Sequence, residues 1–355
     1  MFLFFAICFI IFLSVFIFWS KCTGGKASKK LINYLSKDEK KKIAIITDAN
    51  IYSIYKKRIN RIFRDLDYYV FVIRAGESSK SFDFYTRILN YLCENNFTRS
   101  DTILAFGGGV TGDLAGFVAS TYLRGIEYVC VPTTLLAMVD SSVGGKNGIN
   151  FFNLKNQVGT FYFPSYVHVD HSFIKTLDKR NINNGLAEMF KYAILDDRDL
   201  FDELCKDFSE IDLEKVIERS LRIKLKYVSG DERDLDKRQY LNLGHTIGHA
   251  IEALSKYSVK HGEAIALGIV FMAKAAYRMK LTEDDFYNEI IDAFEKHGLM
   301  TEYDFNLDYA MEIIEHDKKV KNGMINMIIP TSIGSAINKE VNLESLKHFI
   351  EIGME

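Results

Sequence analysis

The chain lacks the features that mark several classes of protein. Its three prolines among 355 residues fit a protein with many helices and few stiff loops. A formal net charge of −2 provides no basic excess for binding nucleic acid, and no acidic tail points to disorder. The sequence also has no internal repeat and no low-complexity linker. These absences leave an ordinary globular protein, long enough for two domains.

Cysteine gives no structural framework either. The cysteines are odd in number, scattered, and never form a C-x-x-C pair. This pattern excludes a disulfide scaffold and a cysteine metal cage, and it fits a reducing compartment such as the cytoplasm. The cysteines are Cys8, Cys22, Cys93, Cys130 and Cys205.

Residues 1–20 form one uninterrupted apolar run, long enough to cross a bilayer. No basic residue precedes the run and no small-residue cleavage site ends it, so a cleaved secretion signal is a poor match. The lysines that follow would keep the rest of the chain on the cytoplasmic side. They are Lys21, Lys26, Lys29 and Lys30. Two interpretations stay open: a transmembrane helix that tethers a cytoplasmic protein to the inner face of the membrane, and a misplaced start site.

Strand and helix patterns alternate after that run. Apolar, β-branched segments predict strands near 42–47, 68–74, 101–107 and 127–132, with helical patterns between them. From about residue 178 helical periodicity dominates, and only 324–330 resembles a late strand. We therefore predict an α/β domain with a parallel sheet at 21–177, a mostly helical domain at 178–355, and a cleft between them.

A glycine-rich segment follows the third predicted strand. Residues 107–112 have the G-x-G-x-x-G spacing, and Asp113 falls in the first turn of the next predicted helix. Such a turn lets backbone N–H groups and a helix dipole approach a pyrophosphate, although a simple tight turn has the same pattern. The residue that binds the ribose stays open between Glu127 and the pair Asp48 and Asn50.

Lys146, Lys155 and Asn156 lie in segments rich in Gly and Asn near the predicted domain boundary. Cations held in turns suit the recognition of phosphate or carboxylate groups. A single lysine of this kind is usually a solvated loop charge, and the clustering is what favours a phosphate site.

Two histidines four residues apart, His245 and His249, share one face of a predicted helix. With His261 close behind them, three imidazoles indicate a metal site, whereas hydrogen-bonded core histidines are the alternative. Glu188 lies in another apolar helical stretch, where an unpaired carboxylate is costly to bury. It either pairs with Lys191 or completes a three-ligand metal site of the catalytic kind.

Long motifs that contain these residues resemble the 3-dehydroquinate synthases, in the order found in that family. They are G-G-G-V-T-G-D-L-A-G-F, V-P-T-T-L-L-A-M-V-D-S-S-V-G-G-K-N-G-I-N, G-L-A-E-M-F-K-Y-A, L-N-L-G-H-T-I-G-H-A-I-E and H-G-E-A-I-A-L-G. The resemblance runs from about Lys42 to near the C-terminus. It implies a Rossmann-like N-terminal domain that binds NAD and a mostly helical C-terminal domain that binds metal and substrate.

The resemblance also implies a lyase of the shikimate pathway, which leads to the aromatic amino acids. Such an enzyme converts 3-deoxy-D-arabino-heptulosonate 7-phosphate to 3-dehydroquinate and phosphate. The steps are transient oxidation by NAD, elimination of phosphate, re-reduction and intramolecular aldol closure, without net redox change. The expected metal is zinc, with cobalt as the alternative, and the expected assembly is a homodimer in which Arg124 reaches the phosphate bound to the neighbouring subunit.

The resemblance assigns roles to individual residues. The implied metal ligands are Glu188, His245 and His261. The implied catalytic residues are His249, Lys146, Lys191, Lys224, Arg238, Asn242, Asp140 and Glu232. The implied substrate contacts are Arg124, Lys146, Asn156, Lys224, Arg238, Asn242, His249, Lys318 and Lys319. The implied NAD contacts are Asp48, Asn50, Glu77, Lys80, Gly109, Val110, Thr111, Gly112, Asp113, Thr133, Thr134, Lys146, Lys155, Phe173, Ile174, Lys175 and Thr176.

The chain departs from the family pattern at two places. The apolar run stands where the family has a short β segment, so this departure concerns the edge of the sheet and the dimer. Asp234 stands where the family more often has Glu. Neither departure touches the expected catalytic groups.

Three alternatives remain. Another sugar-phosphate cyclase would share the NAD, metal and phosphate sites but would differ at the substrate carboxylate, which Lys224 and Arg238 are expected to bind. A metal-dependent polyol dehydrogenase would release NADH and would not need the lysine cluster. A membrane-tethered protein that used the fold only as a binding scaffold would not need the metal ligands or the phosphate-binding cations.

Overall fold

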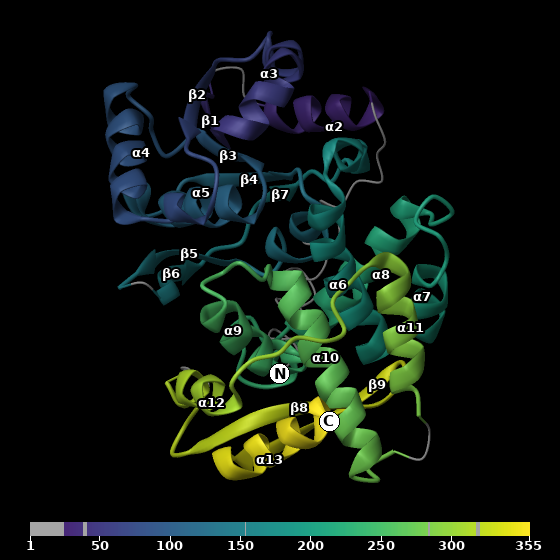
Figure 1. Cartoon of the computed structure of the whole chain (residues 1–355). Helices are drawn as coiled ribbons and strands as arrows, with labels where there is room; N and C mark the ends of the chain where they lie inside the picture. Colours follow the sequence, from purple (N-terminus) through teal and green to yellow (C-terminus); the bar gives the residue numbers. More distant parts are fainter. Residues whose placement is uncertain (1–24, 38–40, 153, 283–284, 317–319) are drawn as a thin grey trace, which may run out of the picture. The chain divides into compact units, whose positions relative to one another are not determined.

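The computed structural model describes residues 25–37, 41–152, 154–282, 285–316 and 320–355. The chain forms two compact units, and the boundary between them falls after Leu177 (Figure 1). The apolar run at 1–20 and the predicted phosphate contacts Lys318 and Lys319 lie outside the described residues.

The expectation of a transmembrane helix has to be corrected. Within the ranges given above, no helix is both long enough and apolar enough to cross a membrane. The longest helices in these ranges, with 18 residues each, carry charged residues.

The first unit is built on a five-stranded parallel sheet, which confirms the predicted α/β class. Every neighbouring pair of strands in it is parallel. The order across the sheet is β2 (Tyr68–Ile73), β1 (Ile43–Asp48), β3 (Thr102–Gly107), β4 (Glu127–Pro132) and β7 (Tyr166–Val167). Among the described residues no strand precedes β1, and α2 (Gly25–Leu35) stands there instead.

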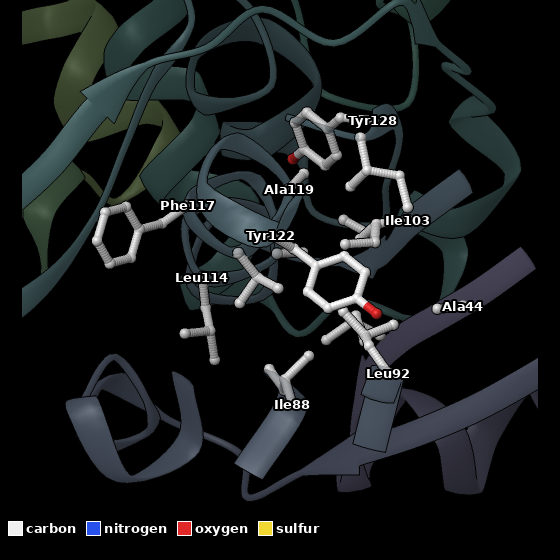
Figure 2. Packing of buried hydrophobic residues seen from close by; sticks show 14 of the residues in the cluster. Ala44, Ile88, Leu92, Ile103, Leu114, Phe117, Ala119, Tyr122 and Tyr128 are labelled. Carbon is white, nitrogen blue, oxygen red and sulfur yellow. The ribbon is translucent and has the colours of Figure 1, made fainter. Parts of the chain in front are cut away.

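Helices connect these strands because apolar positions recur at helical spacing between them. They are α3 (Ala49–Phe63), α4 (Phe82–Glu94) and α5 (Gly109–Thr121). Alternate residues of the strands, such as Ala44 and Ile103, join α4 and α5 in one buried cluster. Figure 2 shows Tyr122, which ends α5, among Ile88 and Leu92 of α4. Its hydroxyl donates to the carbonyl of Phe97, so the cluster leaves no polar atom of that ring unsatisfied.

An antiparallel hairpin replaces part of what the sequence predicts as loops. Its strands are β5 (Lys146–Phe151) and β6 (Leu154–Phe161). Gly148 and Gly159 face each other in this pair, and a Cβ on Gly159 would lie 2.1 Å from the carbonyl oxygen of Asn147. The glycines that looked like loop residues therefore allow two strands to lie close together.

The second unit is mostly helical, as predicted. Its helices are α6 (Lys179–Asp196), α7 (Arg198–Leu204), α8 (Leu213–Val228), α9 (His245–Leu254), α10 (His261–Arg278), α11 (Tyr287–His297), α12 (Leu307–Glu315) and α13 (Leu343–Met354). Helix α10 is buried along most of its length and contacts α6, α9, α11 and α13. The predicted late strand is β8 (Met324–Ser332), but it pairs with β9 (Ser335–Asn342), which the sequence analysis missed.

Candidate active site

The glycine-rich segment has the context that a phosphate-binding turn requires. Strand β3 ends at Gly107, Gly108 caps the next helix, and α5 begins at Gly109. A Cβ on Gly107 would lie 2.6 Å from the hydroxyl oxygen of Thr111, so the turn is too tight for a side chain there. The first N–H groups of α5 therefore point out of the carboxyl edge of the sheet, where helix termini attract anions.

A cluster centred on Lys80 lies beside this turn. Lys80 is 4% exposed, and its Nζ lies 2.6 Å from Asp113 Oδ2 and 3.7 Å from Glu77 Oε1. It also donates to Asn156 of the hairpin, while Asn150 donates to Glu77 over 2.9 Å. Burial works to lower the pKa of Lys80, but Asp113 and Glu77 outweigh it and raise that pKa, so the lysine stays charged.

Other predicted NAD contacts occupy the same edge of the sheet. Asp48 ends β1 and caps α3, where its carboxylate accepts the N–H groups of Asn50 and Ile51. Thr133 follows β4, and its buried hydroxyl has no hydrogen-bond partner among the described residues. Thr134 accepts the N–H of Ala137. Parallel strands thus bring separate parts of the chain to one edge.

The side chains of several predicted NAD contacts are buried or already hydrogen-bonded within the protein. Phe173 and Ile174 are buried, so only their backbone can meet a ligand. The Thr176 hydroxyl is hydrogen-bonded to Tyr55. Lys146 is exposed at the start of β5, whereas Lys155 is half-buried on β6. Three of the remaining predicted NAD contacts lie in the first turn of α5, and Lys175 is exposed within residues 171–176. The three are Val110, Thr111 and Gly112. Asp140, a predicted catalytic residue, lies in a short helical turn after β4.

Glu127 does not fit the ribose role that the sequence left open. It begins β4 and therefore lies at the amino edge of the parallel sheet, opposite the glycine turn. Its carboxylate binds Lys41, Tyr34 and Thr102. Burial works to raise its pKa, but these partners outweigh it and lower that pKa. Glu127 is a structural anion, which leaves Asp48 and Asn50 as candidates.

Arg124 also lies away from the glycine turn of its own chain. Helix α5 starts at that turn and spans about 20 Å at 1.5 Å per residue before Arg124 follows. Arg124 is exposed, and both it and Leu123 have positive φ, of 67° and 51°. Left-handed backbone at two successive non-glycine residues costs free energy, so the surrounding structure holds this arginine in place.

The second unit brings the three predicted metal ligands together. Glu188 projects from α6, His245 from the first turn of α9 and His261 from the first residue of α10. The two imidazole Nε2 atoms lie 3.6 Å and 3.4 Å from the same oxygen, Glu188 Oε1. Ligand atoms at zinc distances of 2.0–2.2 Å in a tetrahedral site are separated by about 3.3–3.6 Å. The spacing therefore matches a shared metal better than direct hydrogen bonds.

The state of Glu188 points the same way. Its side chain is fully buried, and neither carboxylate oxygen accepts a well-formed hydrogen bond among the described residues. Lys191 Nζ lies 2.5 Å from Oε2, so the predicted ion pair is also present and leaves Oε1 facing the histidines. Burial works to lower the pKa of His261, but Glu188 and Glu252 outweigh it and raise that pKa to about 10. The cluster thus attracts positive charge, as a metal site should.

Glycines set the distance between the three helices. A Cβ on Gly268 of α10 would lie 2.1 Å from the carbonyl oxygen of Gly244, the residue before α9. A Cβ on Gly262 would lie 2.5 Å from Cα of Asn184 in α6. Asn184 also accepts the Gly262 N–H through its side chain over 2.8 Å. Direct backbone contact therefore brings α9 and α10, and α10 and α6, close enough for their side chains to share one metal.

His249 and Glu252 line the same helix face. With His245 they follow the i, i+4, i+7 spacing of one stripe on α9. The ring of His249 lies 5.2 Å from that of His245 and 5.9 Å from that of His261, centre to centre. Glu252 was not among the predicted site residues, although its spacing from the histidines is visible in the motif. Its carboxylate lies 3.1 Å from His261 Nδ1.

The predicted substrate residues of this unit fall on neighbouring elements. Lys224 is buried on α8, and Arg238 is buried in a short helical turn that ends at Asn242. Arg238 donates to the carbonyl of Glu232 over 2.7 Å. Asp231, which the sequence analysis missed, accepts three backbone N–H groups between residues 235 and 238 and so fixes this loop. Asp234 has positive φ within it.

Comparison with protein families gives matches to both units. Residues 70–184 match the model described as 3-dehydroquinate synthase N-terminal, and residues 185–320 match the one described as 3-dehydroquinate synthase C-terminal. The 3-dehydroquinate synthase of Caldanaerobacter subterraneus subsp. tengcongensis is 40% identical, over 86% of this chain and 90% of its own. That of Streptococcus suis is 41% identical, over 88% and 90%.

Solved structures give a consistent result. A 2-epi-5-epi-valiolone synthase from Streptomyces hygroscopicus subsp. jinggangensis, with NAD+ and Zn2+ bound, has a TM-score of 0.83 and 27% identity over 91% of each chain. A 2-deoxy-scyllo-inosose synthase complexed with carbaglucose-6-phosphate, NAD+ and Co2+ has a TM-score of 0.83 and 26% identity, over 92% of this chain and 95% of its own. A probable glycerol dehydrogenase from Sinorhizobium meliloti, at 16% identity and a TM-score of 0.62, shares the fold alone.

Proposed function

The chain belongs to the 3-dehydroquinate synthase family, whose members are lyases, and we propose the reaction that follows from this membership. The enzyme converts 3-deoxy-D-arabino-heptulosonate 7-phosphate to 3-dehydroquinate and phosphate. The observation that carries the proposal is the convergence of Glu188, His245 and His261 on one point in the second unit. A first unit with a phosphate-binding turn supports it.

The proposal includes NAD and one divalent metal ion, with zinc preferred over cobalt. Glu188, His245 and His261 would hold the metal, because their spacing and the buried, hydrogen-bond-free oxygen of Glu188 fit one. When bound, the metal lowers the pKa of substrate hydroxyls, and NAD takes up a hydride and returns it, so the chemistry has no net redox change. We assign residues 21–177 to NAD and residues 178–355 to the metal and substrate.

The protein's own residues orient these partners and move protons. His249 lies next to both ligand histidines without completing the Glu188 set, so we assign to its imidazole the proton exchanged with a substrate hydroxyl. Lys191 balances the charge of Glu188 at Oε2 and leaves Oε1 for the metal. Asp48, Asn50, Glu77 and Lys80, with residues 109–113 and 173–176, Thr133, Thr134, Lys146 and Lys155, are the proposed NAD contacts.

Separate groups of side chains bind the carboxylate and the phosphate of the substrate in this proposal. Lys224 and Arg238 bind the carboxylate, because each is a cation held in a buried position on the second unit. The phosphate contacts are Lys146, Asn156, Asn242, Lys318 and Lys319. Asp140 and Glu232 complete the polar surroundings.

We also propose a homodimer in which Arg124 serves the partner's phosphate. Its place at the far end of α5 from the glycine turn supports a role outside its own chain. The nearby hairpin, the residues that follow it and the start of α4 expose large apolar side chains. Tyr162, which directly follows β6, donates to the carbonyl of Ile126, two residues after Arg124. Exposed apolar patches of this kind mark protein interfaces. The exposed side chains are Phe82, Phe151, Phe152, Leu154, Phe161 and Phe163.

A cytoplasmic location completes the proposal. The cysteines of the described residues are free: Cys93, Cys130 and Cys205. Free thiols fit a reducing compartment.

The second candidate is another sugar-phosphate cyclase, because the structures with a TM-score of 0.83 are of that kind. The substrate carboxylate separates the two. The Arg238→Met variant should lose activity on the heptulosonate phosphate through a raised KM, whereas an enzyme for a neutral sugar phosphate would be indifferent to the change.

The decisive test is phosphate release by the purified protein. We expect release from the heptulosonate phosphate, loss on chelation and recovery with zinc or cobalt, without NADH accumulation. Net NADH would indicate a polyol dehydrogenase, and inactivity with every substrate a scaffold. The His249→Ala variant should keep its bound metal and lose roughly 10²–10⁴-fold in turnover. Loss of metal from that variant would contradict the role given to His249.

A further inference from the structure

Glu252 has no part in the metal set or in the proton exchange described above. It is 4% exposed near the end of α9, an environment in which a carboxylate is costly without a partner. Its Oε2 lies 3.1 Å from His261 Nδ1, within hydrogen-bond range. The opposite nitrogen of the same ring, Nε2, faces Glu188 over 3.4 Å. One imidazole therefore lies between two carboxylates that contact different nitrogens.

The contact of His261 with Glu252 is shorter than its contact with Glu188, and the two lengths indicate different kinds of interaction. A separation of 3.1 Å suits a hydrogen bond from Nδ1–H to a carboxylate, whereas 3.4 Å matches the distance between two ligands of one metal. A neutral imidazole has one N–H and one lone pair, so a proton held at Nδ1 leaves the lone pair at Nε2. The ring then offers its lone pair in the direction of Glu188 and His245.

The other ligand histidine is oriented by a weaker partner. His245 Nδ1 lies 3.0 Å from the backbone carbonyl of Leu243. A carbonyl fixes the tautomer in the same way but carries no charge. A carboxylate also makes the imidazole a better electron donor to a metal. Because this carboxylate belongs to a side chain, a substitution can remove it, which is not possible for the backbone carbonyl of Leu243.

We propose that Glu252 is a positioning residue: it accepts the Nδ1–H of His261 and so aims Nε2 at the metal held with Glu188 and His245. The inference rests on the proposed metal site. Glu252 itself does not bind the metal. His249, Glu252 and His261 also lie close enough to form a ligand set of their own, and the experiment treats that set as the competing outcome.

The experiment measures the zinc affinity of the purified full chain by competition with a chelator. Glu252→Ala should weaken zinc binding by roughly 10- to 100-fold, and Glu252→Gln, which keeps an oxygen acceptor without the charge, by less. Both variants should still bind one zinc at saturation. With cobalt as the probe, the visible spectrum should keep its intensity and shift in position, because the ligands stay the same while their donor strength changes.

Glu263 provides a matched control. It lies on the first turn of α10, two residues after His261, and pairs with Arg180 instead of the ring. Glu263→Gln should lower the stability of the metal-free protein and leave the zinc affinity unchanged. A loss of zinc affinity in that variant equal to the loss in Glu252→Ala would show a merely structural effect and overturn the proposal.

The outcomes separate this inference from the proposed function. If Glu188→Ala weakens zinc binding strongly and Glu252→Ala does not, the metal site stands and the positioning role fails. If Glu188→Ala binds zinc as the unaltered protein does, the metal site itself fails. If His249→Ala and Glu252→Ala both lose zinc completely, the metal uses the competing set and the positioning role is wrong.

Discussion

The two units treat a histidine shielded from solvent in opposite ways. His168 in the first unit is buried, and burial lowers its pKa to about 4, with Arg58 and Lys30 adding to the effect against Asp170. The pKa of His261 in the second unit is raised to about 10, because Glu188 and Glu252 outweigh burial. The first unit therefore keeps its imidazole neutral, whereas the second surrounds one with negative charge. Burial decides the charge of His168, whereas the neighbouring carboxylates decide that of His261.

The same contrast holds for how each unit builds its site. In the first unit, groups from separate segments meet because parallel strands end at one edge. In the second, they meet because three helices touch through glycine backbones. Perturbing each arrangement should therefore have different consequences.

Gly268→Ala should have the largest effect. The new Cβ would lie 2.1 Å from the Gly244 carbonyl oxygen. A backbone atom cannot relieve this overlap by a change of rotamer, as a side chain can. We expect a loss of about 4 kcal/mol in the free energy of unfolding, above the typical range for overpacking, together with weakened zinc binding. Urea unfolding and zinc titration measure the two effects.

Gly112→Ala in the first unit is the comparison for that variant. Its Cβ would meet only the Tyr128 hydroxyl, at 3.7 Å, which is ordinary contact. Its unfolding free energy should change by less than about 1 kcal/mol. Equal destabilisation by the two variants would show that the loss in Gly268→Ala does not come from the close approach to the Gly244 backbone.

Lys80→Met should have the next largest effect, in the first unit. The change leaves Asp113 and Glu77 without their shared cation and should cost about 3 kcal/mol, because breaking a buried pair strands its partner. Unfolding in urea measures the loss. Adding Asp113→Asn should recover part of it, and Lys57→Met on the exposed side of α3 should change little. No recovery in the double variant would argue against the pair.

His168 should make the smallest contribution, visible only in acid. The unfolded chain takes up a proton near pH 6.5 while the folded chain resists until about pH 4, so stability is lost as the pH falls through this window. The loss at pH 5 should be about 2 kcal/mol. His168→Gln should flatten the dependence of unfolding free energy on pH, and His348→Gln, at an exposed site on α13, should not. An unchanged slope in His168→Gln would show that another group causes it.

The sequence predicted most of the elements that position the site, for physical reasons. Strands β1 to β4 are apolar runs rich in β-branched residues. Because these runs alternate with helical patterns, they predict the strands of a parallel sheet. The hairpin of β5 and β6 was missed because its glycines and asparagines have low strand propensity, and only their pairing shows why they are needed. Strand β9 was missed because most of its residues face solvent.

Individual residues were harder to predict than elements. The sequence already predicts that Glu127 begins a strand, but only the structure shows that Lys41, Tyr34 and Thr102 occupy its carboxylate. Glu252 follows the spacing of the histidines but gains meaning only from its distance to His261, which comes from a different helix. Proximity between helices depends on tertiary packing, and no local pattern encodes it.

The contact between Gly244 and Gly268 has a consequence for how such a protein can change. No side chain takes part in it, so gradual substitution cannot loosen it in small steps. Residues on the outer faces of α9 and α10 can be substituted, and the substrate specificity can change, while the separation of the two helix axes stays the same. An engineer who wants a different metal geometry must therefore alter the ligands themselves, because the frame that carries them is not adjustable.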